Sequence, residues 1–206
     1  MPYDLSKPLV IGISSRALFN LEQENKIFEE QGVEAYEAYQ VTHENEILQK
    51  GAAFQLIKAF LELNNTELGR LVEVIIMSRN NANTCLRIFN SIQYYGLDIT
   101  RATLTSGAEI APYLKAFKTD LFLSANSDDV QSAINDGLPQ DVFLQVMRMP
   151  IQSKRLIRSA LHLMEMQFFF QPNLKRFFRR MEYRHLKNMR KRMRTRRWQK
   201  VRLLTS

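Results

Sequence analysis

Four short apolar runs in the sequence each end at a small polar residue, and such residues have the chemistry to hold an anion. The serines that end the runs are Ser14, Ser78, Ser106 and Ser124. Hydroxyl groups and loop amides suit a phosphate group. Strand ends are commonly polar whatever their role, so one such serine carries little weight, whereas the four together favour a phosphate site.

Residues beside these serines complete a candidate set for binding a phosphate or a nucleotide. The set comprises Ser14, Ser15, Arg16, Ser78, Arg79, Asn80 and Lys115. An arginine can hold a phosphate through two parallel hydrogen bonds. Lys115 lies on a predicted short helix, 112–117, where it either neutralises a phosphate or is simply solvated, as most lysines on short helices are.

The other candidate groups favour ordinary structural roles. His43 has no second histidine nearby and is followed by carboxylates, which favours a surface position. Asp128 and Asp129 could bind a metal as a pair, but they come where acids stabilise the start of a helix. The chain has no glycine-rich phosphate loop of standard spacing and no Cys and His cluster with zinc spacing. We therefore predict no catalytic residue and no metal ligand in this chain.

Apolar runs and helical patterns alternate along the chain, beginning with the segment 8–20, PLVIGISSRALFN. Its residues 9–13 are typical of a buried strand, and a sharp loop and a helix follow. Gly32 predicts a break or a cap within the first long helix. The predicted strands are 9–13, 71–77, 102–105 and 121–123, and the predicted helices are 22–39, 54–63, 84–95, 112–117 and 128–135. This alternation predicts an α/β fold, a Rossmann-like parallel sheet with helices on both faces. The serines then share the edge where such sheets bind ligands.

The composition is that of an intracellular globular protein. The 206 residues suffice for one domain with a real core. Cys85, the single cysteine, excludes an intramolecular disulfide. The first ten residues lack the basic start and apolar middle of a signal peptide, and no apolar run approaches the length of a membrane span. We expect a reduced, soluble, cytoplasmic protein, and the sequence leaves its oligomeric state open.

The net charge of +8 divides sharply along the chain. Residues 1–137 carry 11 Lys and Arg against 18 Asp and Glu, a net charge of −7, whereas residues 138–206 carry 18 against 3, a net charge of +15. So sharp a change indicates a boundary. We predict an α/β domain over 5–137 and a basic, poorly packed tail over 138–206.

Long stretches of the first part resemble one known family. Over residues 5–137 the chain closely resembles the cytosolic 5′-nucleotidase type I family. The stretches that carry the resemblance are LVIGISSRALFNLEQENKIFEEQGVEAYEAYQ, HENE, VEVIIMSRNNANTCLRIFNSIQYYGLDITRA and YLKAFKTDLFLSANSDDV. That family is in turn similar to the haloacid-dehalogenase-like phosphatases. The resemblance implies hydrolysis of nucleoside 5′-monophosphates such as AMP or IMP through a covalent aspartyl-phosphate, with Mg²⁺ offsetting the phosphate charge.

The chain departs from this family at the nucleophile. The family's motif, Phe-Asp-Gly-Asp-Ala-Val, belongs beyond residue 137, and this chain nowhere contains it. The first strand resembles a degenerate copy, in which Ser14 and Arg16 stand for the two aspartates. No obvious base near Ser14 would activate its hydroxyl, and Arg16 would repel Mg²⁺ while still suiting a phosphate. We therefore expect little hydrolysis from this chain.

The missing motif can be recovered from the tail in another reading frame. Residues 161–170 are LHLMEMQFFF. The other frame joins the third base of each codon to the first two bases of the next codon. Methionine has a single codon, which ends in G, and glutamate codons begin with GA. Met164 with Glu165 must therefore give GGA, a glycine codon. Met166 with Gln167 must likewise give alanine. This frame permits Phe-Asp-Gly-Asp-Ala-Val, and across 185–194 it permits Phe-Lys-Glu-His-Glu-Lys-Glu-Asn-Glu, which echoes residues 43–46.

Glutamate-rich codons read in the shifted frame also become Arg and Lys, which accounts for the basic tail. We interpret residues 138–206 as frame-shifted. In this interpretation the gene encodes a protein of two related halves, and this chain is a truncated form of that protein. The alternative is coincidence in a Met-rich segment.

The tail offers an alternative function whatever its origin. Trp198, Tyr183, Phe177 and Phe178 lie among its basic residues and could stack on bases. Polybasic segments bind nucleic acid or anionic membranes non-specifically, with strong salt dependence. The alternative to a nucleotidase is therefore a non-catalytic polybasic binder, and a solvated tail that binds nothing is the simpler outcome.

Overall fold

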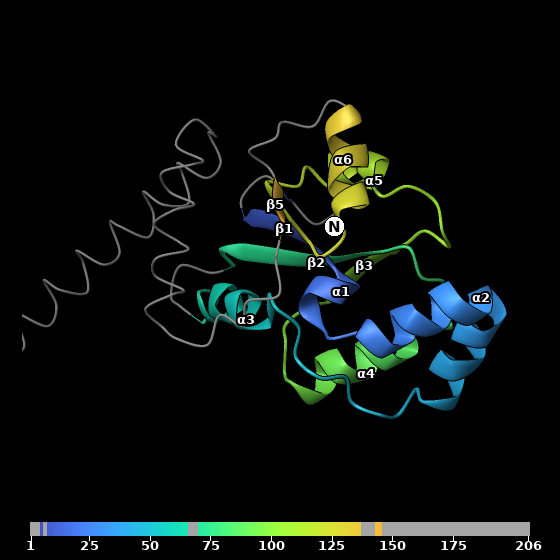
Figure 1. Cartoon of the computed structure of the whole chain (residues 1–206). Helices are drawn as coiled ribbons and strands as arrows, with labels where there is room; N and C mark the ends of the chain where they lie inside the picture. The colour runs from blue at the N-terminus through green and yellow to red at the C-terminus, as the bar shows by residue number, and fades with distance from the viewer. Residues whose placement is uncertain (1–4, 6–7, 66–69, 137–142, 146–206) are drawn as a thin grey trace, which may run out of the picture.

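In the part of the chain that the structure describes, five parallel strands form the centre of the fold. The structure is a computed structural model that describes residues 5, 8–65, 70–136 and 143–145. The strands are β1 (Leu9–Ser14), β2 (Val72–Ser78), β3 (Arg101–Leu104), β4 (Leu121–Ser124) and β5 (Phe143–Gln145). They form one sheet in the order β3-β2-β1-β4-β5, and each neighbouring pair is parallel. The Rossmann-like α/β fold expected from the sequence is confirmed (Figure 1).

Helices cover both faces of this sheet. They are α1 (Ser15–Leu18), α2 (Glu22–Thr42), α3 (Phe54–Glu62), α4 (Leu86–Tyr94), α5 (Ala111–Ala116) and α6 (Ser127–Asn135). Figure 1 shows α5 and α6 on one side of the sheet and α1, α3 and α4 on the other. Alternate side chains of β1 enter two separate cores. Ile11 and Ile13 join the core that contains α3 and α4, and Val10 joins the core that contains Leu114 and Ala133.

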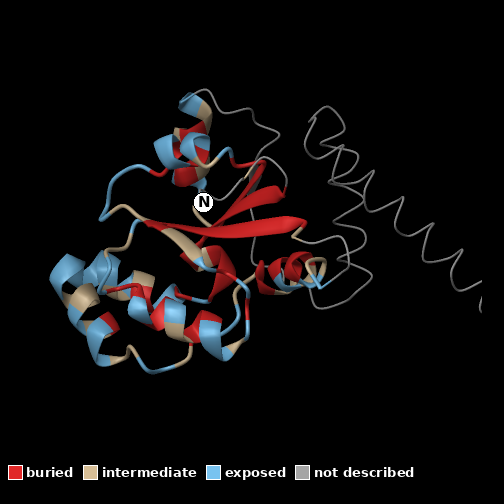
Figure 2. Cartoon of the chain, turned by 180° about the vertical axis from the view of Figure 1, so that it is seen from behind, coloured by how far each residue is buried: buried red, intermediate tan, exposed pale blue. Residues whose placement is uncertain are grey.

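The central strands are continuous apolar runs because both of their faces are covered. Every residue of β1, β2 and β4 is buried, as expected for parallel strands between two layers of helices. Figure 2 shows the buried strands and the exposed outer faces of the helices. β1 pairs with β2 from Leu9 and Val72 to Ser14 and Met77, so these two strands end side by side. This register brings the polar residues that follow them to one edge.

The bounds of the predicted elements differ from the observed ones by a few residues at most, and the predicted break at Gly32 is confirmed. Gly32 has φ 86° and ψ −177°, which divides α2 into two arms, 22–31 and 33–42. A positive φ of this kind favours glycine, because it brings the Cβ atom of other residues too close to the backbone. α2 is therefore two short helices rather than one straight one.

The strand β5 was not among the predicted strands, and it lies beyond residue 137. The domain boundary at that residue stays a prediction. The predictions for the rest of 138–206, including Tyr183, Trp198 and the out-of-frame motif, lie outside the described residues. Within the part of the chain that the structure describes, no helix combines the length and the apolar character that crossing a membrane requires.

Candidate functional site

The order of the strands creates a switch point at the carboxyl end of β1. The chain adds β2 and β3 on one side of β1 and then crosses over to add β4 and β5 on the other. Open α/β sheets bind ligands outside the carboxyl ends of their strands at such a point. A cleft of about 430 Å³ lies there, within the ~300–1,000 Å³ typical of small-molecule sites. Its walls are formed by α1 and α2, by the loops after β2 and β3, and by the start of α6.

All the predicted site residues except Lys115 line this cleft. The lining includes Ser14, Ser15, Arg16, Ser78, Arg79 and Asn80, and also Ser106. The parallel register therefore brings these residues together, whatever their role.

The residues outside the lining of the cleft include Lys115, Ser124 and His43. Lys115 is exposed on α5 and donates a hydrogen bond to the main-chain carbonyl of Asp136. Ser124 is fully buried, and its hydroxyl accepts a hydrogen bond from the Asn126 amide. His43 stacks on Tyr39, with 3.9 Å between the ring centroids.

Ser14 lies at the end of the central strand and begins α1. It is buried, and its Oγ accepts hydrogen bonds from the main-chain amides of Ala17 at 3.2 Å and Ala125 at 3.3 Å. A hydroxyl has two acceptor lone pairs and one O–H. Both lone pairs of Ser14 are thus occupied by backbone amides, and what it can offer a ligand is its O–H.

The loops after β2 and β3 are tied together beside Ser14. The amide of Ser106 donates to the carbonyl of Asn80, and the amide of Gly107 donates to the carbonyl of Arg79 at 2.7 Å. The Oγ atoms of Ser15 and Ser78 are 3.4 Å apart. Ser106 and Gly107 both have positive φ, 49° and 92°. These contacts fix a polar wall that combines hydroxyl groups, an amide side chain and the Arg79 guanidinium.

Arg79 pairs with an acid from α6 that also lines the cleft. Its Nη2 lies 2.7 Å from Oδ1 of Asp129, and the side chains are 40% and 7% exposed respectively. Burial raises the pKa of the Asp129 carboxyl, although Arg79 acts in the opposite direction. Asp128 and Asp129 do lie in the first turn of α6, as expected. The place of Asp129 in the cleft was missed, because nothing in the sequence links it to Arg79.

The two arms of α2 supply a wall that sequence reasoning also missed. Phe28 and Val33 line the cleft, as does Tyr36. Tyr36 donates a hydrogen bond from its hydroxyl to Oδ1 of Asn80 at 3.0 Å and accepts one from Gln40 Nε2 at 3.1 Å. Burial raises the pKa of the Tyr36 hydroxyl, which therefore stays protonated at neutral pH. The break at Gly32 was the signal in the sequence that could have suggested a folded-back helix.

A buried ion pair holds the start of α2 against α4. Glu24 lines the cleft, and its Oε1 lies 2.7 Å from Nη1 of Arg87. Arg87 also donates from Nε to the carbonyl of Glu46 at 2.9 Å. Removing one partner of such a pair leaves an uncompensated buried charge. Next to it, burial raises the pKa of the Cys85 thiol to about 11, so this cysteine is protonated and unreactive at neutral pH.

The carboxylates of the cleft do not fit the Mg²⁺ that the family resemblance implies. Glu24, Glu37 and Asp129 are the acids in the lining. Two of them are paired with guanidinium groups, and Glu37 accepts a hydrogen bond from the Asn81 amide group. Among the described residues, no group of three His, Cys, Asp or Glu side chains lies close enough together to hold a metal. The described cleft is thus suited to an anion and lacks a ready set of hard ligands.

Comparison with known proteins agrees with the resemblance found in the sequence. A family model described as 5′-nucleotidase matches residues 1–164, which extends past residue 137. Cytosolic 5′-nucleotidase 1B of Homo sapiens is 41% identical over 137 residues, covering 63% of this chain. The match covers 22% of that relative, so the chain spans about a fifth of its length. No solved structure matches this chain. Since the family model covers well over half of its residues, the chain belongs to the 5′-nucleotidase family.

Proposed function

We propose that the cleft binds the phosphate of a nucleoside 5′-monophosphate such as AMP or IMP, and that this chain alone hydrolyses it little. The observation that carries the proposal is the composition of the cleft at the switch point. Hydroxyl groups and Arg79 meet there, and a serine rather than an aspartate ends the central strand. Membership of the 5′-nucleotidase family supports this substrate class.

Arg79 is the group best suited to the phosphate. Its guanidinium is partly exposed and presents several N–H donors, which match phosphate oxygens. The phosphate competes with Asp129 for this guanidinium, while the hydroxyl of Ser14 and those of Ser15 and Ser78 supply neutral donors. Arg16, on α1, adds a second positive charge to the same lining.

Hydrolysis needs groups that the described cleft lacks. In the family chemistry a carboxylate attacks the phosphorus and Mg²⁺ offsets the phosphate charge. The hydrogen-bond partners of Ser14 Oγ are backbone amides, which cannot take its proton. The carboxylates of Glu24 and Asp129 are each already engaged by a guanidinium group.

Binding and hydrolysis are tested separately with the full chain. The double variant Arg79→Gln with Asp129→Asn removes the guanidinium together with its partner, so no buried charge is left alone. Losing hydrogen bonds from a charged group costs ~1.5–3 kcal/mol. We therefore expect AMP to bind at least about tenfold more weakly by titration calorimetry. Lys115→Gln, outside the cleft, is the matched control and should bind like the unaltered chain. Undetectable AMP binding by the unaltered chain would overturn the proposal.

Phosphate release from AMP and IMP with Mg²⁺ tests the second part. The 206-residue chain is assayed beside a version in which the out-of-frame sequence of the tail is restored. We expect the restored version to exceed this chain by several orders of magnitude, about 10⁶ in a case where a nucleophile is lost. Equal rates would mean that other residues carry the chemistry.

The boundary near residue 137 and the frame-shifted origin of 138–206 belong to the same proposal. The sharp change of charge and the recovered motif support them. Sequencing the transcript across the codons for residues 136–139 tests the origin directly. The name of the human relative describes it as cytosolic, and we propose the same compartment for this chain.

A further inference from the structure

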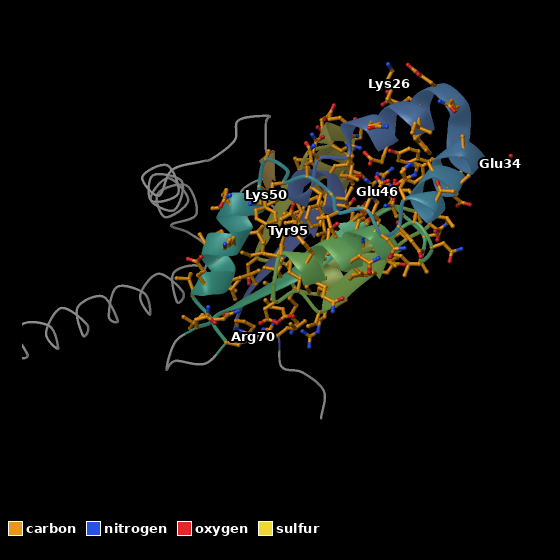
Figure 3. The ribbon with its side chains drawn as sticks, turned by 90° about the horizontal axis from the view of Figure 1, so that it is seen from below. Lys26, Glu34, Glu46, Lys50, Arg70 and Tyr95 are labelled. Atoms are coloured by element: carbon orange, nitrogen blue, oxygen red, sulfur yellow. The ribbon has the colours of Figure 1, made fainter. Side chains whose placement is uncertain are left out.

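The two arms of α2 present apolar side chains to an otherwise polar cleft. Phe28, on the first arm, is 48% exposed, and Val33, just after the break, is 55% exposed. Both line the cleft. Figure 3 shows the arms through Lys26 and Glu34, at the opposite end of the described residues from Arg70. An exposed aromatic ring in a ligand cleft is informative, because burying it is favourable and the fold leaves it available.

The ring of Phe28 packs against a second aromatic ring, that of Tyr36. It meets Tyr36 edge to face, with 5.9 Å between the ring centroids and an angle of 83° between the planes. Such aromatic pairs are favourable beyond the area they bury. Tyr36 is itself fixed by its hydrogen bonds to Asn80 and Gln40. These contacts restrict the Phe28 ring, which can therefore serve as a platform, that is, a fixed aromatic surface on which a planar group could stack.

The platform is connected directly to the polar wall. Asn80, which holds Tyr36, follows Arg79 in the loop after β2. A ligand bound by its phosphate at Arg79 would thus have an aromatic face across the same cleft. Nucleotides carry an aromatic base joined to a phosphate through one sugar, and every base has a π face that stacks on aromatic rings.

We propose that Phe28 stacks on the base of the nucleotide, with Tyr36 as the residue that positions it. This inference rests on the proposed function, because it assumes a phosphate in the same cleft. It predicts that the platform contributes to the binding of a nucleotide and contributes nothing to a sugar phosphate without a base.

Titration calorimetry with the full chain tests the inference with AMP and with ribose 5-phosphate. The variants are Phe28→Ala, Phe28→Trp and Val41→Ala. Val41 is the matched control, because it is 49% exposed on the second arm of α2 and does not line the cleft. We expect Phe28→Ala to weaken AMP about tenfold or more while leaving ribose 5-phosphate unchanged. Phe28→Trp should retain AMP, and Val41→Ala should change neither ligand.

The outcomes separate this inference from the proposed function. If the unaltered chain binds neither ligand, the proposed function fails and this inference fails with it. If the unaltered chain binds AMP and Phe28→Ala binds it equally well, the stacking role of Phe28 is wrong, and the proposed phosphate site is unaffected. Equal losses of AMP and ribose 5-phosphate in Phe28→Ala would also overturn stacking. Circular dichroism of each variant accompanies the titrations.

Discussion

Ser14 lies where the central strand meets the cleft, and its hydroxyl stabilises the backbone there. Ser14 Oγ accepts from two backbone amides, those of Ala17 and Ala125. One amide belongs to α1 and the other follows β4, so this side chain links the two sides of the switch point. An alanine would leave both amides without this acceptor.

Ser14→Ala should therefore lower the free energy of unfolding by about 1–3 kcal/mol, the cost of leaving buried donors unpaired. Urea denaturation followed by circular dichroism measures the difference. Ser127→Ala, at an exposed serine, is the control and should stay within about 0.5 kcal/mol of the unaltered chain. Equal stability of Ser14→Ala and the control would mean that water replaces the lost acceptor.

Asp129 gives the stability of the folded chain a dependence on pH. Because burial raises its pKa in the folded chain, folding favours its protonated form. The stability that this provides is fully present below the ordinary carboxyl pKa and is lost as pH rises through the folded value. Asp129→Asn does not titrate at this position. Plotted against pH from acid to neutral, the unfolding free energy of the unaltered chain should fall relative to that of Asp129→Asn. A constant difference would contradict the raised pKa.

At the scale of the elements, local pattern predicted most of the sheet. The strand at 9–13 and the strand at 71–77 were predictable because buried parallel strands are continuous apolar runs. Their common edge followed from the parallel arrangement alone, which is why Ser14 and Ser78 could be expected to meet. Lys115 lies away from them because its helix, α5, packs on one face of the sheet, and helix packing is decided by tertiary contacts.

The aromatic wall shows why the rest of the site could not be predicted. Gly32 indicated a break, but a break does not give the angle between two arms. Phe28 and Tyr36 meet only because that angle folds one arm onto the other. The pair formed by Arg79 and Asp129 joins residues 50 positions apart through two separate loops. Such contacts depend on the whole fold rather than on any local pattern.

Gly51 marks another place where a loop and an element are tightly fitted. A Cβ atom there would lie 2.7–2.8 Å from backbone atoms of Ala17, Leu18 and Phe19. Its amide also donates to the carbonyl of Leu18 at 2.9 Å. Backbone cannot move aside as a flexible side chain can, so Gly51→Ala should cost about 3 kcal/mol of stability.

Gly96→Ala serves as a comparison variant, in which the expected loss of stability has a different cause. Gly96 has φ 62°, and a Cβ atom there would have open space, so the cost is the backbone strain of about 1 kcal/mol. Thermal unfolding of both variants measures the difference. A smaller loss for Gly51→Ala than for Gly96→Ala would mean that the loop 48–53 shifts easily away from α1.

At the scale of the whole molecule, the chain joins an acidic part to a strongly basic one. Residues 138–206 carry a net charge of +15. We expect non-specific binding of RNA and of anionic vesicles at low salt, through counterion release. For RNA the affinity should fall about 10³-fold or more between about 50 and 200 mM salt. Fluorescence titration of labelled RNA and of vesicles, with a chain lacking residues 146–206 as control, measures this. Absence of binding at low salt removes the alternative function, and sequence-specific binding would favour it over the nucleotidase.

The fifth strand, β5, determines the shortest fragment of this chain in which β4 remains paired on both sides. β5 pairs with β4 along Phe122, Leu123 and Ser124, and without it β4 becomes the edge of the sheet. An exposed edge of unpaired amides and carbonyls is a template for strand addition by another molecule. Cutting the chain at residue 137, where the charge changes sign, would therefore favour aggregation. A fragment that keeps β4 covered must extend at least to Gln145.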